Sequence, residues 1–279
     1  QVSDYTAGYM WGTTGFIFNP QFVNREDLLS WGAILDPKFE NRILMKDAFR
    51  DVYSVLVLYA FRNELEAGTV NRDELVRNIT KKRVDAVKEI LLQAKNQICG
   101  WEVDFGKEEM TKGKAWLNLS WSGDAQFAIE EAAEMGVMLD YIVPQEGSNV
   151  WFDGWVIPKY AKNVKAATYF IDYMCKAENA LANMDEIGYV SCAGGPNAAA
   201  EVLEEMNDEE EWPETVDASY FFGDQPIVVE DEVLDPHALH LNPVYYADKS
   251  IIDRCALMHD AGDSQEMLLE MWNEIKLAR

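Results

Sequence analysis

Positively charged residues are scarce in this chain. Its 279 residues include 24 lysines and arginines against 49 aspartates and glutamates, which gives a formal net charge of −25 at pH 7. Nucleic acids and anionic lipids are bound through basic surface, so this charge argues against both as partners. The excess of carboxylates favours cationic ligands, although an acidic surface alone names no partner.

Long apolar runs, paired cysteines and catalytic signatures are also missing. The longest apolar runs, such as 55–61, are far too short to span a bilayer. There are only three histidines, and no G-x-S-x-G, P-loop or H-E-x-x-H motif. No C-x-x-C pair exists, which argues against a structural zinc site and leaves one disulfide or free thiols among Cys99, Cys175, Cys192 and Cys255. The sequence therefore predicts no metal and no cofactor.

Strand-like and helix-like patterns alternate along the chain, which is typical of an α/β fold. The length suits one large or two medium domains. Strands are expected over 9–19, 43–45, 115–120, 138–143 and 150–157. Helices are expected over 24–31, 48–66, 73–79, 81–97, 106–112, 125–135, 163–180, 180–187 and 263–278.

The most informative stretch is the predicted strand that runs from Ser148 to Pro158. It carries Trp151 and Asp153, and residues two apart on a strand point to the same face. A carboxylate beside an indole face suits an organic cation, because one offers a charge partner and the other a π-surface. The alternative is a half-buried strand that carries a surface aspartate.

Other candidate ligand groups follow predicted strands, where open α/β sheets bind their ligands. Asp47 and Asp51 follow one strand, Trp121 follows another, and Asp104 lies in a connecting loop. Each has a simpler structural interpretation, since aspartates cap helices and loop aromatics pack. Asp124 is expected to cap the helix that follows Trp121, so its substitution should matter little.

Five motifs in order resemble the spermidine/putrescine-binding proteins of polyamine ABC importers, within the periplasmic-binding-protein superfamily. One is Tyr9-Met10-Trp11-Gly12, which is similar to a segment that crosses between lobes. The others are the helix start MKDAFRDV at 45–52, Trp121-Ser122-Gly123, the run from Val143 to Gly147 with Trp151-Phe152-Asp153, and Ile187-Gly188-Tyr189.

The resemblance implies a two-lobed, type II fold and a non-catalytic receptor. Such a receptor captures a polyamine between its lobes and delivers it to the membrane permease of an ABC transporter. It works in the periplasm or on the outer face of the cytoplasmic membrane, as a lipid-anchored lipoprotein in Gram-positive bacteria. Carried over by motif, the expected ligand-binding residues are Trp11, Asp51, Trp121, Trp151, Asp153 and Tyr189, with Asp47 and Asp104 as additional candidates.

The chain departs from the family pattern at three polar positions. Ala48 replaces an acid of the helix-start motif, Val103 aligns near a serine, and Met258 aligns near a glutamine. Asp47 or Asp104 would compensate; otherwise one end of the pocket is less polar. A shorter or singly charged amine is then expected in preference to spermidine.

Two other functions were compared with amine binding. Tyr245 and Tyr246 resemble the paired tyrosines of ferric-iron-binding relatives, and a site for another small cation belongs to the same alternative. A hydrolase would need Asp47 and Asp51 as acid and base, but they lack a nucleophile and their spacing suits capping better.

The resemblance also predicts how the chain is divided. Residues 1–14 and 150–196 are expected to form a first lobe that lacks its N-terminal portion, and 15–149 with 197–279 a complete second lobe. Residues 201–235 hold fourteen acidic and no basic residues, so about 201–250 is expected to be a solvated insertion. Apolar side chains of the incomplete lobe, including Tyr169, Phe170 and Met174, are expected to drive self-association.

Overall fold

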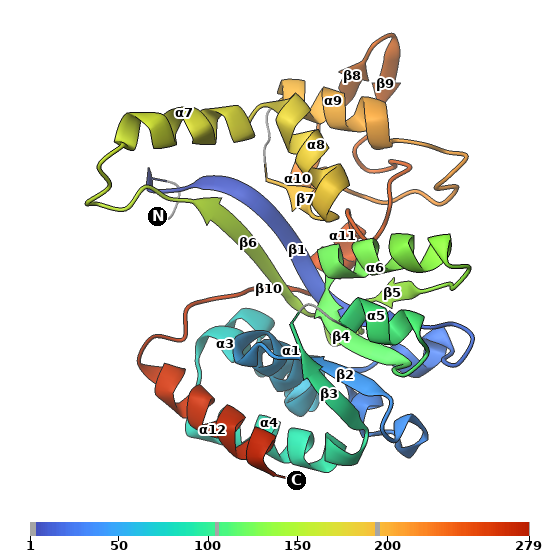
Figure 1. Cartoon of the computed structure of the whole chain (residues 1–279), viewed down its shortest axis with the longest axis vertical. Helices are drawn as coiled ribbons and strands as arrows, with labels where there is room; N and C mark the ends of the chain where they lie inside the picture. The colour runs from blue at the N-terminus through green and yellow to red at the C-terminus, as the bar shows by residue number, and fades with distance from the viewer. Residues whose placement is uncertain (1–3, 104–105, 193–195, 279) are drawn as a thin grey trace. The chain divides into compact units, whose positions relative to one another are not determined.

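The chain divides into two compact units. The computed structural model describes residues 4–103, 106–192 and 196–278. Unit 1 comprises Gln1–Gly12 and Trp151–Ile252, and unit 2 comprises Thr13–Val150 and Asp253–Arg279. The chain passes from one unit to the other within two long strands, β1 (Ala7–Phe18) and β6 (Asn149–Trp155), and once more after Ile252 (Figure 1).

Unit 2 is a mixed sheet with helices on both faces. Its other strands are β2 (Ile43–Lys46), β3 (Ile98–Glu102), β4 (Leu117–Trp121), β5 (Asp140–Ile142) and β10 (Ala256–Leu257). The strand order is β10-β6-β1-β4-β2-β3, and β5 also pairs with β1. β2 runs parallel to both β3 and β4, whereas β1 is antiparallel to β4, so the carboxyl ends of β2, β3 and β4 lie at one edge.

The helices of unit 2 cover the two faces of this sheet unequally. They are α1 (Phe49–Ala60), α2 (Arg62–Glu66), α3 (Arg72–Arg77), α4 (Lys81–Gln93), α5 (Gly106–Thr111), α6 (Ser122–Glu134) and α12 (Gln265–Leu277). Figure 1 shows α1, α3, α4 and α12 grouped on one face and α5 and α6 on the other. The main apolar core lies under the first group, where Phe16, Trp31 and Leu56 are fully buried. Its burial is the main source of stability for this unit.

Some expected helices of unit 2 are shorter than the sequence patterns indicated. The helix expected over 48–66 is interrupted at Phe61, which leaves the helical region with φ −114° and ψ 25°. Where a helix was expected over 24–31, the chain forms only a 3₁₀ turn at Arg25–Leu28, and two further 3₁₀ turns follow at Trp31–Leu35 and Pro37–Phe39. Further 3₁₀ turns lie at Ala94–Asn96 and Gly262–Ser264.

Unit 1 contains mostly short elements. They are β7 (Val190–Ser191), β8 (Ile227–Val229), β9 (Glu232–Leu234), α7 (Val164–Met174), α8 (Ala177–Ile187), α9 (Pro196–Met206), α10 (Ser219–Phe222) and α11 (Lys249–Ile252). β7 pairs with β1 at Met10 and Trp11, and β8 with β9 forms a separate hairpin. Gly188 ends α8 in the left-handed conformation, at φ 71°, as its sequence predicted.

The expected assignment of residues 197–252 to the second lobe is wrong, because these residues belong to unit 1. They are also not a solvated insertion. Leu239, Leu241 and Tyr246 are at most 1% exposed. Tyr246 packs against Trp11 of β1, with ring centroids 6.4 Å apart. The acidic side chains occupy the outside of a folded segment whose apolar residues complete unit 1.

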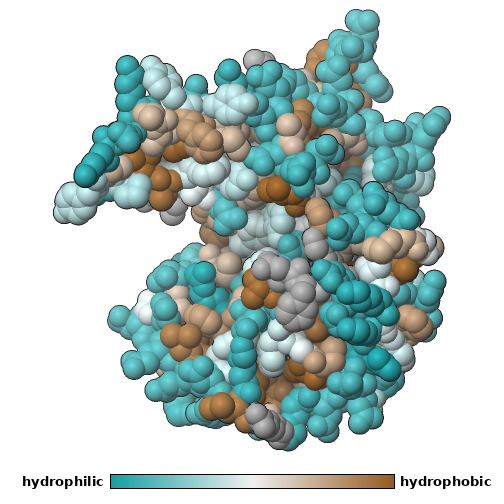
Figure 2. Space-filling view, in the orientation of Figure 1, coloured by the Kyte–Doolittle hydropathy of each residue, from teal (hydrophilic) through white to brown (hydrophobic). Residues whose placement is uncertain are grey.

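The long helix α7 of unit 1 has no buried residue. Tyr169, Phe170 and Tyr173 of α7 are all more than half exposed. Figure 2 shows hydrophobic side chains gathered along this helix, at the upper left of the view. No helix within the described ranges is long and apolar enough to cross a membrane.

A tight turn ahead of β6 gives a test of this architecture. Gly147 has φ 97°, and a Cβ there would lie 1.7 Å from the carbonyl oxygen of Arg254. Gly147→Ala should therefore lower the free energy of unfolding by at least about 2 kcal/mol, as measured by urea denaturation.

Gly68→Ala is the matched control for this substitution. Gly68 has φ 66°, but nothing lies within 4 Å of a Cβ added there. Its substitution should cost about 1–2 kcal/mol, from the backbone conformation alone, and thus less than that of Gly147, which adds a steric clash. Equal losses for the two variants would show that the Gly147 turn does not pack as described.

Candidate functional site

The carboxyl ends of β2 and β4 bring two predicted ligand residues together in unit 2. Asp51 lies in the first turn of α1, shortly after β2, and Trp121 ends β4. The indole Nε1 of Trp121 donates a hydrogen bond to Asp51 Oδ1 at 2.9 Å. The sequence predicted both residues as ligand groups, and the structure places them in direct contact.

The surroundings of the Asp51 carboxylate disfavour its charged form. Asp51 is only 5% exposed. Burial raises the pKa of its carboxyl group, and the hydrogen bond from Trp121 opposes that rise. Asp51 forms no ion pair in the part of the chain that the structure describes, although the charges of Arg50 and Lys46 act on its carboxylate from a greater distance and also oppose the rise in pKa. A cationic ligand would supply the close ion-pair partner that this carboxylate lacks.

The same edge of the sheet also contains a buried lysine that sequence reasoning missed. Lys46 ends β2 and is 1% exposed. Its Nζ lies 2.5 Å from Asp124 Oδ2 and 3.5 Å from Glu102 Oε1, and it donates to the carbonyl oxygen of Val103 at 2.6 Å. The ammonium also lies 4.1 Å from the centroid of the Trp121 ring. The available signal was a lysine at the end of a short buried strand, since buried charges require partners.

Asp124 therefore has a different role from the one expected. It does not cap α6, because the N-cap residue is Trp121 and no side-chain hydrogen bond caps this helix. The Asp124 carboxylate points instead to Lys46. Glu102 completes this buried group by accepting hydrogen bonds from Asn118 Nδ2 and from the backbone N–H of Gly106, both at 3.1 Å.

A buried asparagine connects the strands that leave unit 2 to the helix turn that carries Asp51. Asn149 of β6 accepts from the Thr14 hydroxyl at 2.7 Å and donates to Ser54 Oγ at 2.5 Å. The Ser54 hydroxyl in turn donates to the backbone oxygen of Asp51 at 2.8 Å. This chain of hydrogen bonds fixes the first turn of α1 relative to β1 and β6.

Two other sequence candidates are not part of this group. Asp47 accepts hydrogen bonds from Trp272 Nε1 at 3.0 Å and from Lys276 Nζ at 2.6 Å, so it attaches α12 to the end of β2. It does not cap α1, whose N-cap residue is Ala48. Asp104 lies outside the described residues.

A second set of predicted residues lies in unit 1. The ring of Trp151 packs against that of Tyr189 with centroids 5.6 Å apart and planes inclined by 59°. Asp153, two residues along β6, is exposed, and partial desolvation raises the pKa of its carboxyl group. The pair of aromatic rings with a neighbouring carboxylate has the chemistry that the sequence indicated for an organic cation.

Trp11 belongs to the interior of unit 1 rather than to this set. It is 7% exposed, stacks on Phe221 at 5.7 Å and meets the edge of Tyr220 at 5.8 Å. Tyr246 is fully buried in the same aromatic cluster. The sequence could not reveal these contacts, because residues 220–246 are far from Trp11 along the chain.

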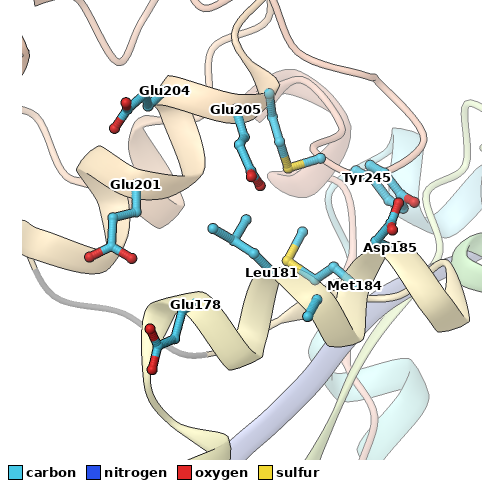
Figure 3. Close-up of a pocket in the computed structure, with 10 residues that line it drawn as sticks. Glu178, Leu181, Met184, Asp185, Glu201, Glu204, Glu205 and Tyr245 are labelled. Carbon is cyan, nitrogen blue, oxygen red and sulfur yellow. The ribbon is translucent and has the colours of Figure 1, made fainter.

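Unit 1 also contains an acidic cavity of about 820 Å³ between α8 and α9. Figure 3 shows glutamates of both helices around an apolar floor that includes Leu181 and Met184. Its acidic residues are Glu178, Asp185, Glu201, Glu204 and Glu205. Tyr245, which was named for the ferric-iron alternative, also lines this cavity, whereas none of the described residues expected to bind an amine does.

The geometry weighs against both alternative functions. Burial raises the pKa of Tyr246 above its ordinary value, which disfavours the phenolate that would bind ferric iron. Within the described residues, no three or more His, Cys, Asp or Glu side chains are grouped to hold a metal. Asp47 and Asp51 have separate partners, Lys276 and Trp121, and do not act on a common point.

Comparison with known proteins gives a consistent family assignment. The family described as bacterial extracellular solute-binding protein matches residues 1–211. The spermidine/putrescine-binding periplasmic protein of Salmonella typhimurium is 26% identical over 277 residues, which are 99% of this chain and 65% of that protein. The chain thus spans about two thirds of the length of this curated relative.

Solved structures share the fold. A Listeria monocytogenes protein assigned to a spermidine/putrescine ABC transporter superposes with a TM-score of 0.72 at 25% identity, covering 99% of this chain and 70% of that one. The spermidine/putrescine ABC transporter substrate-binding protein PotD of Streptococcus pneumoniae gives a TM-score of 0.68 at 21% identity, with the same coverage. The expected α/β fold of the periplasmic-binding-protein type is confirmed.

The burial of Asp51 predicts a stability that depends on pH. Its pKa is raised above the ordinary 3.8, so the folded state binds the proton more tightly than the unfolded chain, and stability falls as pH rises through the raised pKa. Asp51→Asn should therefore raise the melting temperature of the ligand-free protein at pH 7. This gain should shrink as the pH is lowered toward the ordinary pKa, in differential scanning fluorimetry.

Asp47→Asn is the control, because it should change the melting temperature in the opposite direction. Burial by itself raises the pKa of Asp47, but the hydrogen bonds from Lys276 and Trp272 outweigh it and the pKa lies below 3.8. Asp47 thus stabilises the folded state above that value and loses its effect as pH falls, so its substitution should lower the melting temperature at pH 7. A loss of similar size for Asp51→Asn would contradict the electrostatic description of the site.

Proposed function

The chain belongs to the bacterial extracellular solute-binding protein family, and from this premise we propose that it is the substrate-binding component of an ABC importer for a linear polyamine or a related organic amine. The observation that carries the proposal is the contact between Asp51 and Trp121. It combines a buried carboxylate that forms no direct ion pair and an indole that orients it. An ammonium group that binds there gains a charge-assisted hydrogen bond, and the indole offers apolar surface to the methylene stem.

The second set of residues supports the same ligand chemistry. Trp151, Tyr189 and Asp153 present two aromatic rings and an exposed carboxylate in unit 1. Aromatic faces and carboxylates attract cations at short range, and the net charge of −25 draws them from a distance. A linear diamine has two ammonium groups joined by an apolar chain. Its ammonium groups suit the carboxylates, and its chain suits the aromatic rings.

The names of similar proteins support a cellular location and partners for this protein. Relatives of this chain bind spermidine and putrescine in the periplasm, and solved neighbours belong to ABC transporters. We therefore place this protein in the periplasm or on the outer face of the cytoplasmic membrane, with permease subunits as partners. We also propose that it is a receptor without catalytic activity, because the family that it matches is one of solute-binding proteins.

The proposal predicts selective stabilisation by linear amines. Isothermal titration calorimetry and thermal shift with putrescine, cadaverine, spermidine and spermine should show binding, whereas Fe³⁺ and thiamine should not bind. A ligand at 100 times its Kd stabilises the folded state by about 2.7 kcal/mol, which is readily seen as a shift in melting temperature. Absence of heat with every amine, on protein shown to be folded, would overturn the proposed function.

Substitutions in the unit 1 set should weaken amine binding. Trp151→Ala and Asp153→Asn are each expected to cost roughly 1–3 kcal/mol of binding free energy, the range for a cation–π contact or a charge-assisted hydrogen bond. Phe152→Ala is the control, because Phe152 lies between them on β6, is 43% exposed and points to the opposite face. A larger loss for Phe152→Ala than for its two neighbours would place the ligand on the other face of the strand.

A further inference from the structure

Lys46 occupies surroundings that a ligand's ammonium group would also prefer. Its head group donates hydrogen bonds to the Asp124 carboxylate at 2.5 Å and to the Val103 carbonyl oxygen at 2.6 Å, and it forms an ion pair with the Glu102 carboxylate at 3.5 Å. The Trp121 ring lies 4.1 Å away. Two carboxylates, a carbonyl oxygen and an indole face form a complete binding site for a primary ammonium.

The Lys46 ammonium lies against the ring of Trp121, which belongs to the candidate amine site. Trp121 presents a face to Lys46 and its ring N–H to Asp51. The lysine also sits among the predominantly apolar and fully buried residues of β2, Ile43–Lys46, where a charge is retained only with close partners. The indole of Trp121 therefore lies between the ammonium of Lys46 and the carboxylate of Asp51, which forms no direct ion pair.

We infer that Lys46 is a built-in ammonium that fills one cation subsite beside Trp121 and thereby sets the ligand preference toward amines with fewer charges. The inference rests on the proposed amine-binding function. A ligand ammonium at Asp51 has Lys46 as a neighbour, so a further ammonium on a longer ligand meets both an occupied subsite and a like charge. This preference agrees with the shorter or less charged amine that the sequence indicated, and it assigns a specific residue to it.

The subsite itself is tested by chemical rescue. Lys46→Ala removes the three outer methylene groups and the ammonium, and n-propylammonium restores the same atoms. Millimolar n-propylammonium chloride should raise the melting temperature of the Lys46→Ala protein by several degrees more than that of the wild type, in which only the ligand site at Asp51 can take this amine. n-Propanol, which has the shape without the charge, should not rescue the variant.

Lys276→Ala is the matched control for the rescue. It also removes a lysine that is paired with a carboxylate, that of Asp47 at 2.6 Å, but the Lys276 side chain is 36% exposed. n-Propylammonium should not restore its stability, because a solvated site gains little from an exposed ion pair. Equal responses of the two variants would show that Lys46 does not occupy a built ammonium site.

Ligand preference is tested separately by calorimetry. In Lys46→Ala, the ratio of the Kd for spermidine to the Kd for putrescine should fall at least tenfold relative to the wild type. Lys46→Gln keeps a donor for the Val103 carbonyl oxygen and serves if the alanine variant does not fold. It should shift the ratio in the same direction by at least threefold, because it removes the repulsive charge.

The outcomes separate this inference from the proposed function. A wild type that binds putrescine, with an unchanged ratio in folded variants and no rescue by n-propylammonium, would overturn the role of Lys46 alone. Rescue of Lys46→Ala in a protein whose wild type binds no amine would support the subsite and overturn the proposed function.

Discussion

A buried charge must find partners, and the requirement of Lys46 for them organises the carboxyl edge of the sheet in unit 2. Its ammonium draws Asp124 from α6, Glu102 from β3 and the carbonyl oxygen of Val103 to one point. Desolvation of these charges is compensated only when the contacts are short and the remaining hydrogen bonds are satisfied. Asn118 and the backbone of Gly106 satisfy the Glu102 carboxylate, so the network extends across three neighbouring strands.

Trp121 connects this network to the part of the site that remains available to a ligand. Its ring covers the Lys46 ammonium, and its N–H holds the Asp51 carboxylate in place. Asp51 is thus oriented but not neutralised, which costs stability in the absence of a ligand. Binding sites are often formed from such unfavourable groups, because the ligand supplies the interaction that the folded protein lacks. The hydrogen bonds through Asn149 and Ser54 keep the turn that carries Asp51 from relaxing.

The sequence located the strand that carries two of the candidate residues, but it did not reveal the surroundings of every candidate. The pattern at 148–158 was interpreted as a strand with an indole and a carboxylate, and β6 carries both. Asp47 and Trp11 also follow motif positions, yet one attaches α12 and the other lies in an aromatic cluster with Phe221 and Tyr246. The partners of both are remote in sequence, so local patterns could not distinguish a ligand group from a structural one.

The sequence by itself determined the α/β class, the acidic character and the residue types that suit an amine. These follow from local periodicity, composition and motif order, which act over a few neighbouring residues. Only the tertiary structure decided that residues 197–252 complete unit 1, that Asp124 pairs with a lysine instead of capping a helix, and that Lys46 is buried at all. The physical reason is that burial and pairing depend on which distant segments meet, and the desolvation of a charge is set by all of them together.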